Sequence, residues 1–106
     1  MPSPTNTQED IALGVIPTAP WRVASVDVLP GFRLAVTFRD GLSGVLDCSS
    51  ILTSPQPGIY APLADFDYFQ QVGIELGVLT WPNGADLDPA WMHESLRDNK
   101  TWSVPF

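Results

Sequence analysis

A chain of 106 residues with a formal net charge of −7 is long enough for one compact domain and too short for two of ordinary size. Twelve acidic residues stand against five basic ones, and no run of Lys or Arg occurs. The clustered cations that bind nucleic acid or anionic membrane surfaces are therefore missing, and no stretch approaches the roughly 20 apolar residues that span a bilayer. We expect a soluble protein with no direct nucleic-acid or membrane partner.

The first 20 residues contain four prolines and no Lys or Arg. A secretion signal would instead start with basic residues and continue with a longer apolar stretch. The composition predicts a flexible Pro-rich tail over 1–20 and a single α+β domain over 21–106. Because the only cysteine cannot form an internal disulfide, we expect a reducing compartment, the cytoplasm.

Alternating apolar and polar residues predict three antiparallel strands over 22–29, 32–39 and 42–46. The side chains expected on the buried face are Val26, Val28, Leu34, Val36, Phe38 and Val45.

Two turns set the register of this meander. A three-residue loop over 30–32 is preferred, because a two-residue turn would place the Asp27 carboxylate on the buried face. The pair Asp40-Gly41 tolerates the positive φ angles of a two-residue type I′ turn. That turn would set Val36 opposite Val45.

After the meander, Asp47 or Ser49 can cap a short helical turn. Apolar residues at helical spacing then predict an amphipathic helix over 63–72, which Gly73 would end as a C-cap.

The C-terminal third continues with two short strands, 74–76 and 78–81, which form a second hairpin. Asp88 precedes a proline, as a helix cap does, and predicts a helix that ends near Arg97. The apolar residues of 102–106 should fold back onto the body. The expected fold is therefore α+β, with a three-stranded antiparallel meander, a short second hairpin and two short helices.

Catalytic chemistry finds little support in the sequence. His93 is the only histidine, and a solvent-facing or cap-bonded imidazole is the expected case. Cys48 is expected to be a small half-buried apolar residue, since the nearest basic residue in sequence is Arg39. No nucleophile elbow, phosphate loop, dinucleotide fingerprint or Cys/His metal spacing occurs. We predict no catalytic residues and no cofactor.

Two acidic pairs, Asp65/Asp67 and Asp86/Asp88, have the carboxylate oxygens that Mg²⁺ and Ca²⁺ prefer. A structural interpretation is favoured, because Asp65 suits the first turn of a helix and Asp88 suits a cap. No metal site is predicted.

The run from Trp81 to Leu87 is the most unusual stretch, a turn between strand and helix with one aromatic and two polar side chains. Trp81, Asn83 and Asp86 are therefore the candidate binding residues. A structural account is equally available, in which Trp81 packs in the core while Asn83 and Asp86 bond the loop backbone.

The chain resembles the bacterial family called domain of unknown function 2442. The motifs that carry the resemblance are a strand ending at Phe38, then Asp40-Gly41, Asp47, Pro62-Leu63, Phe69 and the run Trp81 to Leu87. The resemblance covers roughly 21–91. It implies a small α+β cytoplasmic protein with no established activity, often encoded beside another small protein in pairs that look like toxin–antitoxin modules. Some relatives carry a helix-turn-helix domain that this sequence lacks, which argues against direct operator binding.

Three hypotheses about function remain. The first is a non-enzymatic interaction module that binds a partner protein, basic in character, as the antitoxin-like member of a pair. The alternative is a small-molecule binding or catalytic site at the loop from Trp81 to Asp88. A third hypothesis is that self-association is the function of the domain.

Overall fold

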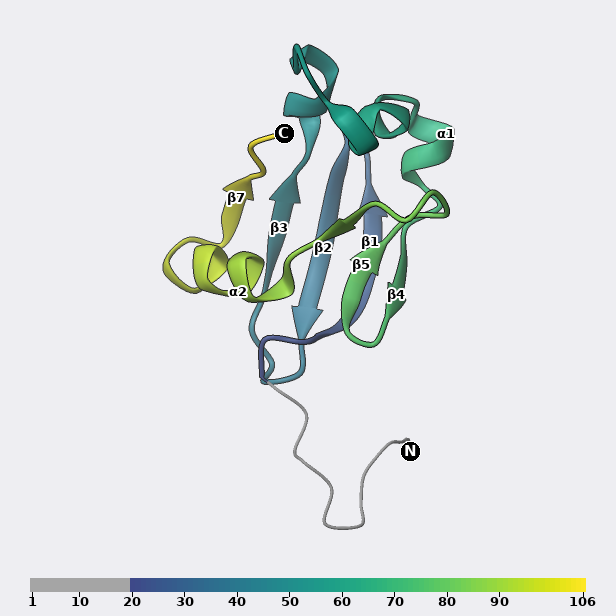
Figure 1. Cartoon of the computed structure of the whole chain (residues 1–106). Coiled ribbons are helices and arrows are strands. Elements are labelled where there is room, and N and C mark those ends of the chain that lie inside the picture. The colour runs from purple at the N-terminus through teal and green to yellow at the C-terminus, as the bar shows by residue number, and fades with distance from the viewer. Residues whose placement is uncertain (1–19) are drawn as a thin grey trace.

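A computed structural model describes residues 20–106, so the expected tail falls outside the described residues apart from its last member. In chain order the elements are β1 (Val23–Leu29), β2 (Arg33–Phe38), β3 (Ser43–Asp47), η1 (Ser49–Thr53), η2 (Gly58–Ala64), α1 (Phe66–Phe69), β4 (Gly73–Glu75), β5 (Val78–Thr80), β6 (Asp86–Leu87), α2 (Pro89–Asp98) and β7 (Thr101–Ser103), where η denotes a 3₁₀-helix. The mixture of antiparallel strands and short helices confirms the α+β fold class (Figure 1).

The main sheet has four strands in the order β1-β2-β3-β7. Its first three strands are the predicted antiparallel meander, and β7 adds to β3 in parallel. The loop between β1 and β2 has the predicted length, since Val28 lies opposite Leu34 and Gly31 adopts a φ of 80°. The C-terminal segment folds back as expected, but its place as a fourth strand was not predicted.

The register between β2 and β3 differs by one residue from the prediction. Val36 lies opposite Gly44, and Val45 lies opposite Ala35 on the other face. The connecting loop has three residues rather than two, because the Phe38 amide bonds the Leu42 carbonyl at 2.7 Å.

Packing explains why this register is preferred. On the buried face, an added methyl group at Gly44 would lie 2.7 Å from the Lys100 carbonyl oxygen and 2.8 Å from Leu96, so only glycine fits beneath α2 and β7. The shift also moves the larger Leu46 into the core in place of Val45. The residues of the turn give no information about these contacts, so the register could not be predicted from the turn alone.

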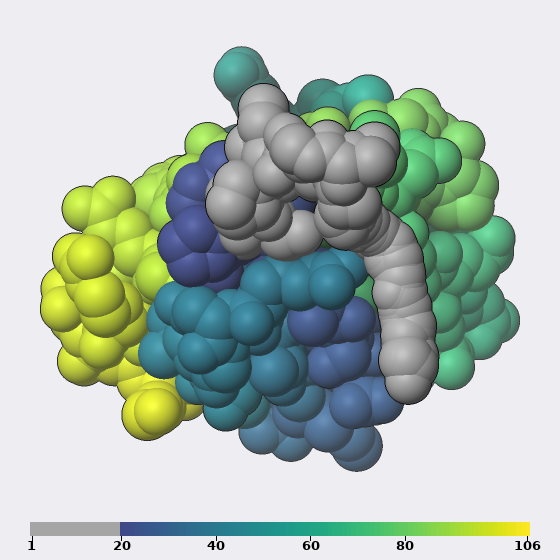
Figure 2. Space-filling model, turned by 90° about the horizontal axis from the view of Figure 1, so that it is seen from below, coloured from purple at the N-terminus to yellow at the C-terminus, as the bar shows by residue number. Residues whose placement is uncertain are grey.

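A second sheet, in the order β4-β5-β6, lies with α2 over one face of the main sheet (Figure 1). Its β4–β5 hairpin was predicted, and a two-residue turn closes it through Leu76 and Gly77, with φ angles of 53° and 80°. The short third strand, β6, was not predicted. Viewed from below, the C-terminal residues (yellow) and the green residues that include the second sheet lie at opposite ends of the molecule, with the first strands of the main sheet between them (Figure 2).

The expected helix over 63–72 is not formed as one element. The 3₁₀-helix η2 contains Pro62, and Asp65 then adopts an extended backbone with φ −92° and ψ 117°. Asp65 starts α1 by accepting a hydrogen bond from the Asp67 amide at 3.0 Å. The predicted C-cap Gly73 is instead the first residue of β4.

The last helix matches its prediction closely. The Asp88 carboxylate accepts a hydrogen bond from the Ala90 amide at 3.0 Å, and Pro89 occupies the first turn of α2. The helix ends at Asp98, one residue past the expected end. Within residues 20–106, no helix combines the length and the apolar character that crossing a bilayer requires.

The core lies between the main sheet and the layer formed by the second sheet and α2. Its buried members are Val23, Leu34, Val36, Phe38, Leu46, Cys48, Ile51, Leu63, Phe69, Leu79, Trp81, Ala85, Leu87, Met92, Leu96 and Val104. Val26 and Val28, predicted as buried, are partly buried against this cluster. The core fixes the start of α2 against β6 and β7, and the site described next lies there.

Candidate functional site

The turn from Trp81 to Ala85 is held by its own hydrogen bonds. The Trp81 side chain is only 3% exposed, and its Nε1–H donates to the Phe69 carbonyl at 3.0 Å. The Trp81 amide bonds the Ala85 carbonyl at 2.9 Å, and Gly84 supplies the positive φ of 91°. Trp81 is therefore a core residue that anchors the turn.

Asn83 is engaged on both sides of its amide group. Its Nδ2 donates to the Ile59 carbonyl at 2.9 Å, and its Oδ1 accepts from the Ala85 amide at 3.0 Å. Its backbone amide donates to the Tyr68 hydroxyl at 2.8 Å. Asn83 thus ties the turn to η2, which matches the structural account of this residue.

Asp86 behaves differently from Asn83. The side chain is exposed, and within residues 20–106 its carboxylate makes no hydrogen bond or ion pair. The structural account, in which this side chain bonds the loop backbone, is therefore wrong for Asp86. Its backbone carbonyl accepts a hydrogen bond from the Tyr60 hydroxyl of η2 at 2.7 Å. The three candidate residues also do not share one pocket. Trp81 lines a depression of about 340 Å³ beside Pro82, whereas Asp86 lines a separate groove.

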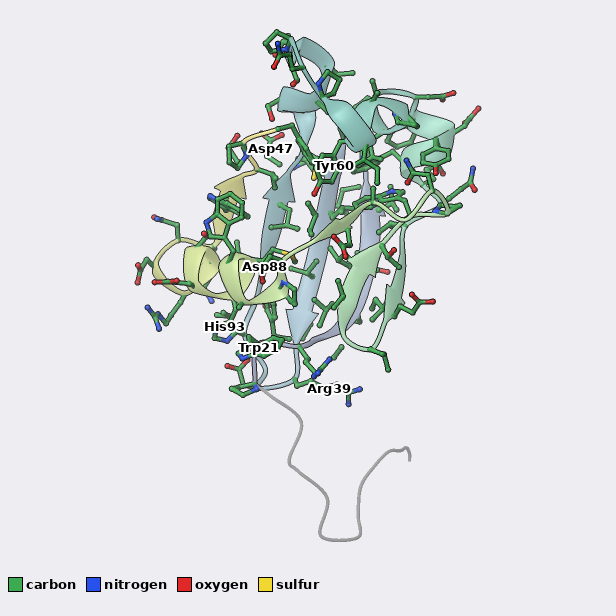
Figure 3. The ribbon with its side chains drawn as sticks, in the orientation of Figure 1. Trp21, Arg39, Asp47, Tyr60, Asp88 and His93 are labelled. Carbon is green, nitrogen blue, oxygen red and sulfur yellow. The ribbon has the colours of Figure 1, made fainter. Side chains whose placement is uncertain are left out.

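That groove, here called the aromatic groove, has a volume of about 370 Å³. It is lined by Tyr60, Val78, Asp86, Leu87, Asp88, Pro89, Trp91, Met92, Trp102 and Val104. These residues come from η2, β5, β6, α2 and the C-terminal segment, so the groove exists only because the chain folds back along β3. Figure 3 shows Tyr60 above the start of α2, where Asp88 is placed.

Three aromatic side chains line the groove. The ring centroids of Trp91 and Trp102 are 4.8 Å apart at an interplanar angle of 66°, an edge-to-face pair. Trp91 is 50% exposed although it belongs to a packed helix. Tyr60 is held by its bond to Asp86 and by an edge contact with Phe106 at 5.2 Å.

Sequence reasoning did not find Trp91 or Trp102 as site residues. One signal was available: Pro89, Met92 and Leu96 follow the i, i+3, i+7 spacing of one apolar stripe in the predicted helix, and Trp91 lies outside this stripe. Trp102 could not be identified as a site residue from the sequence, because its position depends on the parallel pairing of β7 with β3.

The charged side chains that line the groove are all acidic. Asp86 and Asp88 contribute carboxylates, and no Lys or Arg of the described chain lines it. Asp88 uses one oxygen, Oδ1, to cap α2. Burial first and the negative charge of Asp86 second raise the pKa of Tyr60 above its ordinary value. The groove is therefore apolar on its walls and negative at one rim.

The other chemically notable residues lie outside this groove. Cys48 is fully buried, and burial raises its pKa to about 12, so the thiol stays protonated. His93 Nε2 lies 2.7 Å from Asp40 Oδ2, with its side chain 17% exposed, and its ring packs edge-on against Phe38. In the described part of the chain no hydrogen bond joins His93 to a hydroxyl or thiol group, so this pair fastens α2 to the β2–β3 loop.

Local structure explains three of the four residues in the acidic pairs, all but Asp86. Asp67 lies in the first turn of α1, where a negative charge is favourable. Asp65 and Asp88 cap α1 and α2. Over residues 20–106, no group of three His, Cys, Asp or Glu side chains is placed to hold a metal ion.

The fold and the groove together define a small α+β domain with an acidic, aromatic-walled recess. Residues 23–97 match the family described as protein of unknown function (DUF2442), and the chain belongs to this family. The resemblance seen in the sequence is thereby confirmed. No curated protein and no solved structure matches the chain.

Proposed function

We propose that this protein is a non-enzymatic interaction module of the cytoplasm, the antitoxin-like member of a pair, which binds a basic partner protein through the aromatic groove. The observation that carries the proposal is the half-exposed Trp91 beside Trp102 in a recess with two carboxylates at its rim.

Two physical arguments support a protein as the occupant. Tryptophan and tyrosine dominate the centres of protein interfaces, because they bury a large rigid surface at a small entropic cost. The net charge of −7, with acidic residues at the groove, favours encounter with a basic surface by electrostatic steering.

The test is co-expression with the product of the neighbouring gene, followed by size-exclusion chromatography at micromolar concentration. Wild-type protein should co-elute with that product, and Trp91→Ala should abolish co-elution. The matched control is Leu76→Ala, which removes an 85% exposed apolar side chain at the β4–β5 turn, outside the groove. Separate elution of the two wild-type proteins, or equal loss with both variants, would contradict the proposal.

The volume of the groove favours a small-molecule site as a second candidate, since about 370 Å³ falls within the range of ligand pockets. Such a site would include Asp86 but not Trp81 or Asn83, because these two residues do not line it. Saturable binding of a metabolite by the isolated protein, unaffected by any partner, would support this candidate.

A further inference from the structure

We propose that the aromatic groove holds an arginine side chain of the partner protein, an inference that rests on the proposed function and names the chemistry of its central contact.

The aromatic walls suit a flat cation. Trp91 and Trp102 present their rings at 66° to one another, so one indole face can stack on a guanidinium while the second closes the side of the recess. Such stacking combines cation–π attraction with planar contact and is strongest over tryptophan. Tyr60 adds a third ring, fixed in place by its hydrogen bond to the Asp86 carbonyl.

The carboxylates suit the same cation. Within residues 20–106, the Asp86 carboxylate has no hydrogen-bond or ion-pair partner, and the Asp88 carboxylate uses only Oδ1 for its cap and leaves Oδ2 unbonded. They are two positions apart in sequence, and both line the groove. A guanidinium carries five N–H donors in a plane and can bond more than one carboxylate oxygen at once, whereas an ammonium acts as a compact, strongly hydrated point charge. Arginine therefore fits better than lysine.

The apolar residues that line the same groove favour a side chain over a small free cation as the occupant. Val78, Leu87 and Val104 line the same recess. The three methylene groups of an arginine stem would cover this surface while the charged end reaches the rim. An inorganic cation would leave it exposed to water.

The direct test uses two blocked tripeptides, acetyl-Leu-Arg-Leu-amide and its citrulline analogue, which has nearly the same shape and no charge. Binding is followed by NMR through the indole N–H signals of the four tryptophans, all of which lie in the described chain. We expect the arginine peptide to shift the signals of Trp91 and Trp102 in a saturable manner, and to leave the buried Trp81 unchanged. The citrulline peptide should bind at least about tenfold more weakly, the ratio that a loss of about 1.4 kcal/mol produces.

Charge-neutralising variants locate the contact. Asp86→Asn and Asp88→Asn should each weaken binding of the arginine peptide about tenfold, and asparagine keeps the capping role of Asp88. The matched control is Asp27→Asn on β1, which lies at the opposite edge of the main sheet from β7 and should bind like wild type. The NMR spectrum of each variant shows whether it is folded.

The same variants separate the two proposals. If the partner complex forms, is lost with Trp91→Ala and survives both Asp86→Asn and Asp88→Asn, the groove is the docking site but the arginine inference is wrong. Equal binding of the arginine and citrulline peptides would also overturn it. If the complex forms and survives Trp91→Ala as well, docking through the groove fails.

Discussion

Two neighbouring segments of the chain treat their polar groups in opposite ways. In the turn from Trp81 to Ala85, the Trp81 indole N–H and Asn83 Nδ2 donate to backbone carbonyls of other elements. Asn83 Oδ1 accepts from the Ala85 amide within the turn. Asp86, the next residue in the chain, lines the aromatic groove. Its side chain is exposed, and Trp91 and Trp102 line the same groove. The turn uses its polar groups to hold the fold together, whereas the groove leaves the Asp86 carboxylate and Oδ2 of Asp88 without a partner in the described chain.

The difference shows that residue type alone does not mark a site. Trp81 and Trp91 are both tryptophans near the same turn, yet one is 3% exposed and the other 50%. Asn83 and Asp86 are both polar residues of one loop, yet only the side chain of Asn83 is hydrogen bonded within the described chain. In each pair, the structural residue has a side chain that is hydrogen bonded within the described chain, and the candidate binding residue does not.

The largest expected difference in stability is the one between variants of Trp81 and Trp91. Trp81→Ala should lower the free energy of unfolding by about 3–5 kcal/mol, because it opens a cavity in the core and removes the indole hydrogen bond to the Phe69 carbonyl. Trp91→Ala should cost clearly less than Trp81→Ala, because its side chain is half exposed and it loses only the buried half of its surface and the edge contact with Trp102. Urea denaturation measures both values. Similar losses for the two variants would contradict the division between turn and groove.

Replacing Asn83 should have a smaller effect on stability, and it tests the same division between turn and groove. Asn83→Ala removes two side-chain hydrogen bonds and should cost about 2 kcal/mol, while leaving affinity for the arginine peptide unchanged. Asn83→Asp keeps the acceptor for the Ala85 amide but turns a carboxylate oxygen toward the Ile59 carbonyl oxygen, so that two acceptors face each other. Its loss of stability, again from urea denaturation, should be at least as large as that of Asn83→Ala. A fall in peptide affinity with either folded variant would place Asn83 in the binding site after all.

The parts of the fold that depend on local chemistry could be predicted from the sequence. The cap at Asp88 and the loop between β1 and β2 involve residues close together in the chain, and both were correct. The β2–β3 register failed because it is decided by contacts between Gly44 and residues more than fifty positions away, Leu96 and Lys100. The single helix over 63–72 failed at Asp65, whose carboxylate caps a new helix instead of continuing the preceding turn.

The candidate site was only partly predictable for the same reason. Asp86 was found because it belongs to an unusual local motif. Trp102 reaches the groove through a parallel strand pairing with β3, and Tyr60 reaches it through a hydrogen bond to a residue 26 positions later. Neither contact leaves a periodic signal in the sequence, because each joins segments that are brought together only by the packing of η2, α2 and β7.

The smallest predicted effect concerns the pKa of Tyr60, which reports the field inside the groove. Burial and the Asp86 charge both stabilise the neutral phenol, so the pKa of Tyr60 lies above its ordinary value near 10. The stabilising contribution of the neutral phenol is therefore complete below about pH 10 and is lost as the pH rises through the raised pKa. Ring-carbon NMR follows the titration of this one tyrosine.

Asp86→Asn should lower the pKa of Tyr60, because it removes the Coulomb part and leaves the burial part. Bound arginine peptide should also lower it, since a cation in the groove favours the phenolate. Asn83→Asp is an informative control, because it adds a negative charge in the turn rather than in the groove and should change the pKa of Tyr60 less than Asp86→Asn does. If Asp86→Asn left this pKa unchanged, the carboxylate would not act on the groove interior, and the electrostatic half of the arginine inference would lose its support.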